Sequence, residues 1–121
     1  MKQQVLFVDD ERNILEGLER TLRPLRGEWD THYAMSGAEA LQIMNATPID
    51  LVITDIRMPE MDGVELLRIV MKRHPNTIRM VFSGNADSAL IMKAVDVTHH
   101  FFSKPCDPET LRSIVGRALS L

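Results

Sequence analysis

The sequence predicts an α/β fold in which a five-stranded, doubly wound parallel sheet carries helices on both faces. Short apolar runs, such as residues 5–8 (VLFV) and 51–53 (LVI), alternate with segments whose apolar residues recur at helical spacing. Runs that are apolar at every position are typical of strands buried on both faces, as in parallel sheets. Because parallel strands need crossover connections, strict alternation of strands and helices places helices on both sides of the sheet.

Each expected strand is a short apolar or alternating run bounded by turn-forming residues. The five runs are residues 5–8, 30–35, 51–53, 78–82 and 99–102. The second run alternates only weakly, so we expect that strand to be more exposed than the others.

Each expected helix combines an apolar stripe with a start or stop signal. Ser36 with Glu39, and Asp62 with Glu65, have the spacing of a capping box at the start of the second and third helices. Pro108 marks the first turn of the fifth helix. The stripes of the first, third and fifth helices are Ile14, Leu18, Leu22 and Leu25; Val64, Leu67 and Met71; and Leu111, Ile114, Val115 and Ala118. The fourth helix is expected at residues 86–95, where Met92 points away from the main apolar stripe.

Length and composition limit the classes of function. With 121 residues the chain has the size of one domain, and we expect residues 1–121 to form a single domain. A net charge of −3 argues against direct binding of nucleic acid. No apolar run is long enough to cross a bilayer, and the N-terminus leads straight into a strand, so we expect neither a membrane segment nor a signal peptide. The single cysteine, Cys106, suits a cytoplasmic protein.

Polar residues collect where the expected strands end. They are Asp9 and Asp10 after the first strand, Asp55 after the third, Ser83 at the end of the fourth, and Lys104 after the fifth. In an open α/β sheet the carboxyl ends of the strands form one edge, where ligands bind. The sequence therefore predicts that these five side chains meet at one site.

The predicted site has the groups needed to transfer a phosphoryl group onto a carboxylate. Three carboxylates brought together repel one another unless some are protonated or a cation lies between them. Ligands that are all oxygen favour Mg²⁺ or a similar hard ion. The ammonium of Lys104 and the hydroxyl of Ser83 could bind phosphoryl oxygens, and a carboxylate could act as the nucleophile.

Four motifs at these strand ends resemble the receiver domains of two-component response regulators. They are LFVDDE, TDIRMPEMDG, FSG and FFSKP, and the resemblance covers essentially the whole chain. It implies the flavodoxin-like, CheY-like (βα)5 fold with strand order 2-1-3-4-5. It also implies that the domain is a signalling module and that it catalyses only its own phosphorylation and dephosphorylation.

The resemblance assigns a role to each site residue. Asp55 would accept a phosphoryl group from a phosphohistidine on a sensor histidine kinase. Mg²⁺ would be bound by Asp55, directly by Asp10, partly through water by Asp9, and by the backbone carbonyl of Arg57. Lys104 and Ser83 would contact the phosphoryl group, and Ser83 and Phe101 would form the switch. In this family the position of Ser83 is more often Thr, and the position of Phe101 is often Tyr.

The resemblance also suggests partners. Phosphorylation would alter the face formed by the fourth helix, the fifth strand and the fifth helix, which would then bind a second copy or an output domain. Residues 101–108 (FFSKPCDP) are similar to receivers that precede HD-type hydrolase outputs. Any such output domain would lie beyond residue 121.

Two other functions fit an α/β sheet with carboxylates at its edge. A haloacid-dehalogenase-type phosphatase also forms an aspartyl phosphate, but it needs a second Asp two residues after the nucleophile, where this chain has Arg57. A flavodoxin-like module that binds FMN needs a phosphate-binding loop after the first strand, where residues 9–11 (DDE) would repel a phosphate. Both alternatives are therefore weaker than the receiver hypothesis.

Overall fold

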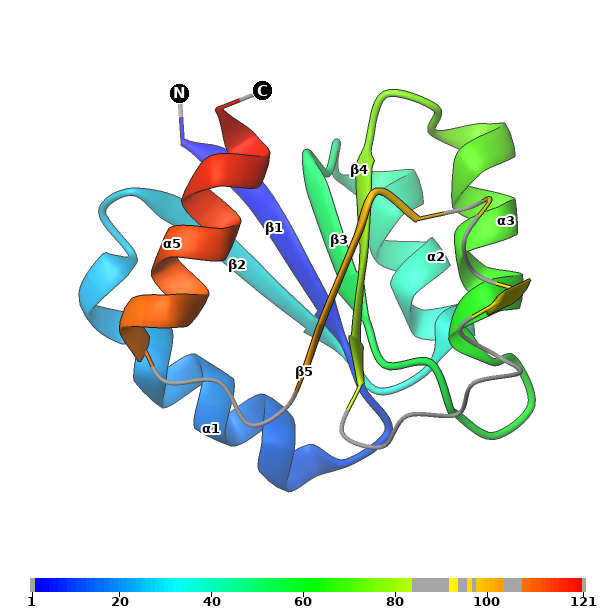
Figure 1. Ribbon diagram of the computed structural model, residues 1–121, viewed down its shortest axis with the longest axis horizontal. Coiled ribbons are helices and arrows are strands. Elements are labelled where there is room, and N and C mark those ends of the chain that lie inside the picture. Colours follow the sequence, from blue (N-terminus) through cyan, green and yellow to red (C-terminus); the bar gives the residue numbers. More distant parts are fainter. Residues whose placement is uncertain (1, 84–91, 94–95, 97, 104–107, 121) are drawn as a thin grey trace.

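The computed structural model describes residues 2–83, 92–93, 96, 98–103 and 108–120, and shows a parallel sheet at the centre of the fold (Figure 1). Its strands are β1 (Gln3–Val8), β2 (Trp29–Ala34), β3 (Leu51–Thr54), β4 (Ile78–Ser83) and β5 (His100–Ser103). They form one five-stranded sheet in the order β2-β1-β3-β4-β5, and every neighbouring pair is parallel. The fold class and strand order expected from the sequence are confirmed.

Helices cover both faces of the sheet. They are α1 (Arg12–Leu22), α2 (Gly37–Ala46), α3 (Gly63–Arg73) and α5 (Pro108–Leu119), and a short 3₁₀ helix, η1 (Arg23–Leu25), follows α1. In Figure 1, α1 and α5 lie on one side of the sheet, and α2 and α3 lie on the other. The fourth helix was expected at residues 86–95, most of which lie outside the described residues. Met92 and Lys93 are described, and both are helical.

Alternation along the central strands divides the core into two apolar layers. On β1, Val5 and Phe7 pack into the layer beneath α1 and α5, and Leu6 and Val8 pack into the layer beneath α2 and α3. All four side chains are at most 2% exposed. Because successive side chains of a strand point to opposite faces, a run without polar residues can fill both layers.

Side-chain caps fix the starts of two helices that approach the carboxyl edge of the sheet. The Ser36 hydroxyl accepts a hydrogen bond of 3.1 Å from the Glu39 N–H at the start of α2. The Asp62 carboxylate accepts one of 2.9 Å from the Glu65 N–H at the start of α3. Each bond satisfies an amide that has no acceptor within its helix, so both predicted N-caps are confirmed.

The edge strand β2 is more exposed than the central strands, as its weak alternation predicts. Only its first and last residues, Trp29 and Ala34, are buried, and the four residues between them are half-buried. One of these, Tyr33, stacks on Phe7 of β1 with ring centroids 5.8 Å apart.

Candidate functional site

Adjacent strand ends bring three carboxylates together. Val8 of β1 lies beside Thr54 of β3 in the sheet register, so Asp9 and Asp10 leave the sheet next to Asp55. The Asp55 N–H donates to the Val8 carbonyl over 2.8 Å and extends the pairing past the last residue of β3. Carboxylate oxygens of Asp9, Asp10 and Asp55 all lie within 4.8 Å of one another.

The carboxylate cluster has the dimensions and the ligands of a site for a hard divalent cation. Two of its members are largely shielded from water, because Asp9 is 3% exposed and Asp55 is 9% exposed. Low exposure strengthens their mutual repulsion, which a cation between them would relieve. Oxygen ligands on opposite sides of a Mg²⁺ ion are about 4.2 Å apart, so modest side-chain movements would bring one oxygen from each residue around one ion.

Asp9 already uses one of its oxygens within the chain. Its Oδ1 accepts a hydrogen bond of 2.9 Å from the Glu11 N–H, just before α1 begins. Its backbone N–H donates to the Ala34 carbonyl at the end of β2 over 3.0 Å. These bonds hold Asp9 at the strand end.

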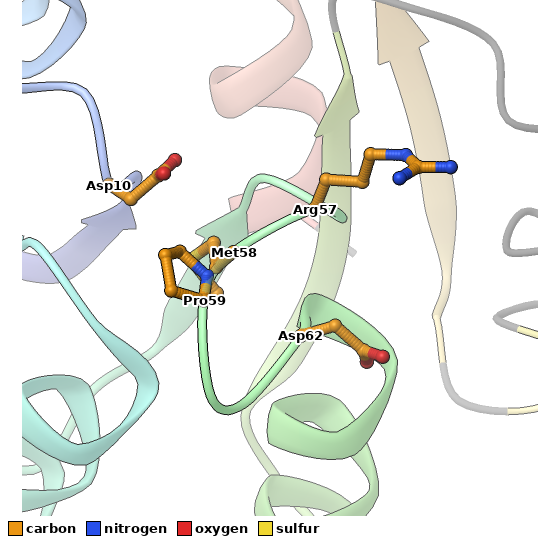
Figure 2. A pocket seen from close by; sticks show the side chains of 5 residues that line it. All are labelled: Asp10, Arg57, Met58, Pro59 and Asp62. Atoms are coloured by element: carbon orange, nitrogen blue, oxygen red, sulfur yellow. The ribbon is translucent and has the colours of Figure 1, made fainter.

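A cavity of about 410 Å³ lies beside the cluster (Figure 2). It is lined by Asp10, Arg57, Met58, Pro59 and Asp62, so the loop between β3 and α3 forms most of its wall. The side chain of Arg57 extends away from Asp10 in Figure 2, which keeps its positive charge off that carboxylate. The cavity leaves space for a phosphoryl group or a hydrated ion next to Asp10.

The backbone around Asp55 is tightly constrained. The Thr54 hydroxyl donates to the Asp55 carbonyl over 2.8 Å, and the Ile56 N–H donates to Asp55 Oδ1 over 2.8 Å. A Cβ atom at Gly63 would collide with the Asp55 carbonyl oxygen and would lie 2.9 Å from the Ile56 Cα. Gly63 therefore allows α3 to begin directly against the end of β3. Neither this contact nor the hydrogen bond of Thr54 was predicted from the sequence.

The loop over the cavity contains one strained residue. Glu60 has a φ of 67° and is the one described residue other than glycine with a positive φ. The next residue, Met61, donates its N–H to the Pro59 carbonyl over 2.7 Å, so the chain turns sharply here. No sequence pattern predicted this conformation, because Glu rarely adopts it.

The remaining predicted site residues come from strands on the other side of β3. Ser83 is the last residue of β4 and lies beside Ser103 in the register with β5, and Phe101 lies beside Val81. The side chains of Ser83 and Phe101, and Lys104 as a whole, fall outside what the structure describes. The structure thus brings together Asp9, Asp10 and Asp55, and leaves the roles of the other residues as predictions.

Comparison with known proteins identifies the family. The family model of the response regulator receiver domain matches residues 5–116. The chain belongs to this family. Receiver domains act in two-component signalling and interact with sensor kinases, and their phosphorylation and binding of Mg²⁺ are general features of the family. Among the described residues, no helix of this receiver domain is long and apolar enough to span a membrane.

The curated relatives are longer proteins, and this chain spans only part of their length. The response regulator protein PilR of Pseudomonas aeruginosa is 38% identical over 99% of this chain, which covers 27% of PilR. The sensor kinase CckA of Brucella abortus is 38% identical over 95% of this chain, which covers 12% of CckA. The crystal structure of the receiver domain of an HD domain-containing protein from Pseudomonas fluorescens Pf-5 is 33% identical. It superposes with a TM-score of 0.93, covering 99% of this chain and 96% of that one.

Proposed function

We propose that Asp55 accepts a phosphoryl group from a phosphohistidine of a sensor histidine kinase. The observation that carries this proposal is the cluster of Asp9, Asp10 and Asp55 within 4.8 Å, beside a cavity at the carboxyl edge of the sheet. Asp55 is the member that follows the central strand β3, and short hydrogen bonds fix its backbone on both sides. A nucleophile held in this way reacts with little loss of orientational entropy.

The transfer is a displacement at phosphorus. A carboxylate oxygen of Asp55 attacks the phosphorus atom while the phosphorus–nitrogen bond to the kinase imidazole breaks, and the released imidazole takes a proton from solvent. Asp10 would bind Mg²⁺ directly, and Asp9 would bind it partly through water. Asp55 and the Arg57 backbone carbonyl would complete the set of ligands that the protein supplies. When bound, Mg²⁺ would offset negative charge on the phosphoryl oxygens.

Lys104 and Ser83 would hold the other phosphoryl oxygens. Ser83 ends β4, and Lys104 directly follows β5. Both strands lie on the side of β3 away from β1, since the sheet order continues β3-β4-β5. Parallel strands bring their carboxyl ends to one edge, so an ammonium from position 104 and a hydroxyl from position 83 would approach the cavity from the side opposite Asp9. Lys104 would neutralise the charge that remains when a dianionic phosphoryl group joins the cluster.

Labelling with a small phosphoryl donor tests this proposal. Incubation with acetyl phosphate and Mg²⁺ should add one acid-labile phosphoryl group, detected as a mass increase, and Asp55→Asn should abolish it. Asp62→Asn is the matched control, because Asp62 lines the same cavity and its replacement can still cap α3. Chelation of Mg²⁺ should also stop labelling. Labelling of Asp55→Asn at the wild-type rate would assign the phosphoryl group to another residue.

A phosphatase of the haloacid dehalogenase type is a poor match to the same site. That chemistry needs a carboxylic acid two residues after the nucleophile, and the guanidinium of Arg57 cannot serve as an acid or base near neutral pH. We therefore propose that the domain catalyses no reaction other than its own phosphorylation and dephosphorylation.

Phosphorylation would be transmitted through Ser83 and Phe101 to the face formed by residues 86–95, β5 and α5. Movement of Ser83 toward a phosphoryl oxygen would shift the segment that follows β4, and Phe101 would move inward. Met92 on this face is 72% exposed, and it is the one large apolar side chain among the described residues with such exposure. An exposed methionine is suited to adaptable contacts with a partner, here a second copy of the chain or an output domain.

Beryllofluoride, which mimics the phosphoryl group, tests this switch. Amide chemical shifts should change in β5, in α5 and in residues 86–95, and sedimentation should report any new dimer. Phe101→Ala should retain labelling of Asp55 and weaken the shifts in residues 86–95. Changes confined to α1 and α2 would place the output surface elsewhere.

The output domain is proposed to be an HD-type hydrolase that follows residue 121, with residues 1–121 as a single cytoplasmic receiver domain. The close superposition with the receiver domain of an HD domain-containing protein supports this assignment. The names of other relatives, such as the hydrogenase transcriptional regulatory protein HoxA, 34% identical, favour a transcriptional output instead. The full-length reading frame decides between these two outputs.

A further inference from the structure

Two hydrogen bonds act on the single peptide group that joins Asp55 to Ile56. The Thr54 hydroxyl donates to the carbonyl of this group over 2.8 Å. The N–H of the same group donates to Oδ1 of the Asp55 side chain over 2.8 Å. We propose that Thr54 is a positioning residue for the phosphoacceptor, because it orients the peptide group that in turn holds the Asp55 carboxylate. This proposal deepens the proposed function and rests on it for its kinetic consequence.

The geometry of the peptide bond explains how a hydroxyl on one side can orient a carboxylate on the other. A trans peptide group is planar, so its C=O and N–H point in opposite directions and turn together. When Thr54 fixes the carbonyl, it therefore also fixes the direction of the Ile56 N–H. A hydrogen bond accepted by the carbonyl also polarises the peptide and strengthens the bond donated by its N–H.

Burial makes Thr54 suited to this role. Its side chain is completely buried, so water does not compete for the hydroxyl. A β-branched side chain has few χ1 rotamers, which limits the directions in which the hydroxyl can point. Thr54 also lies in the middle of the sheet, beside Val8 on one strand and Val81 on the other. Gly63 approaches the same carbonyl from α3, so the peptide group has little space in which to turn.

The proposal predicts which step of phosphorylation Thr54 affects. A bound donor cannot touch a side chain that is completely buried behind Asp55, so the affinity for the donor should not depend on Thr54. The orientation of the nucleophile should depend on it. Loss of the hydroxyl should therefore lower the maximal rate of phosphorylation and leave the half-saturating donor concentration unchanged.

The test compares three variants with the wild type, using acetyl phosphate as donor at saturating Mg²⁺. Thr54→Val keeps the shape of the side chain without its hydroxyl, and should lower the maximal labelling rate by roughly tenfold. Thr54→Ser restores the hydroxyl and should label within roughly twofold of the wild type. Thr77→Val is the matched control, since the Thr77 hydroxyl donates to the Ile49 carbonyl over the same 2.8 Å at the opposite edge of the sheet. It should label at the wild-type rate.

A second readout follows the hydrogen bond itself. The amide proton of Ile56 in the unphosphorylated protein should move upfield in Thr54→Val and not in Thr77→Val, because its bond to the carboxylate weakens. An unchanged Ile56 resonance together with a wild-type labelling rate in Thr54→Val would overturn the proposal. Equal slowing in Thr54→Val and Thr77→Val would also overturn it, by showing a general effect of lost stability. If the wild type takes up no phosphoryl group, the proposed function fails, and the Ile56 resonance still tests the positioning role.

Discussion

The sulfur of Met61 occupies the space that a side chain at position 37 would need. A Cβ atom built on Gly37 would lie 2.5 Å from this sulfur and 3.1 Å from the Met61 Cγ. Gly37 is the first residue of α2, and Met61 belongs to the loop that borders the cavity at Asp10. No described glycine has a positive φ, so this contact, and not the backbone conformation, is what favours glycine at position 37.

The contact predicts that the effect of Gly37→Ala changes sign with the residue at position 61. In the wild-type background the added methyl group clashes with Met61, and the free energy of unfolding should fall by about 1–2 kcal/mol. In a Met61→Ala background only the Cβ of residue 61 remains close, 3.2 Å from the added Cβ. After a shift of a few tenths of an ångström, the same substitution should stabilise the fold by roughly 0.5 kcal/mol because alanine favours a helix. Urea unfolding of the four proteins measures both values.

Gly17→Ala is the control for this cycle. Gly17 lies within α1, and nothing would contact an added Cβ within 4 Å. Its replacement should therefore be stabilising whichever residue occupies position 61. A destabilisation by Gly37→Ala that persists in the Met61→Ala background would show that the sulfur is not the obstacle.

The conformation of Glu60 leads to a second prediction. Its φ of 67° disfavours any residue with a Cβ by roughly 1 kcal/mol, and its side chain is exposed. Glu60→Gly should raise the free energy of unfolding by roughly 0.5–1 kcal/mol, and Glu60→Val should lower it. Thermal unfolding provides the comparison. Glu65→Gly in the first turn of α3 should be destabilising, which separates relief of strain from a general effect of glycine.

The sequence alone predicted the fold and the carboxylate cluster because both follow from repeating patterns. Fully apolar runs such as residues 5–8 predict central strands, and parallel strands in a doubly wound sheet bring Asp10 and Asp55 to the same edge. The strand order itself came from the resemblance to receiver domains. Apolar periodicity does not determine which strands become neighbours.

Details that depend on tertiary packing could not be predicted from the sequence. The contact between Gly37 and Met61 joins positions far apart in the chain, and no local pattern encodes it. The only signal was a glycine directly after the cap Ser36, where a better helix former is expected. The expected strand ended at residue 53, so the hydrogen bond of the Thr54 hydroxyl became evident only from the structure.

The raised pKa of Tyr33 leads us to expect a loss of stability at alkaline pH. Burial raises the pKa of the Tyr33 phenol above 10.0, the hydrogen bond to Thr31 lowers it in part, and the negative charge of Glu19 raises it. Above about pH 10 the unfolded chain therefore releases a proton that the folded chain retains. The folded state then binds more protons than the unfolded state, so the free energy of unfolding falls as pH rises.

Tyr33→Phe should remove this part of the alkaline loss. Urea unfolding at pH 8 and at about pH 11 gives the loss for each protein, and the difference between the two proteins isolates the phenol. Because Tyr33 is the only tyrosine, the absorbance of the phenolate reports its titration directly. Equal alkaline losses in Tyr33→Phe and the wild type would show that other groups cause the effect.

The acidic cluster predicts that Mg²⁺ stabilises the unphosphorylated protein. Asp55 joins Asp9 and Asp10 only in the folded state, so an ion that bridges all three binds that state preferentially. At a Mg²⁺ concentration of ten times its Kd, the free energy of unfolding should rise by about 1.4 kcal/mol by mass action. Thermal unfolding at increasing Mg²⁺ concentration measures this gain.

Asp10→Ala should have opposite effects with and without the ion. Without metal, removal of one of the three clustered carboxylates relieves repulsion, so the variant should melt at a higher temperature than the wild type. With Mg²⁺, the variant should show little further rise, because a direct ligand is missing. Asp62 lines the same cavity but does not belong to the carboxylate cluster, so Asp62→Asn should keep the wild-type response to Mg²⁺. A full Mg²⁺ response in Asp10→Ala would place the metal site away from Asp10.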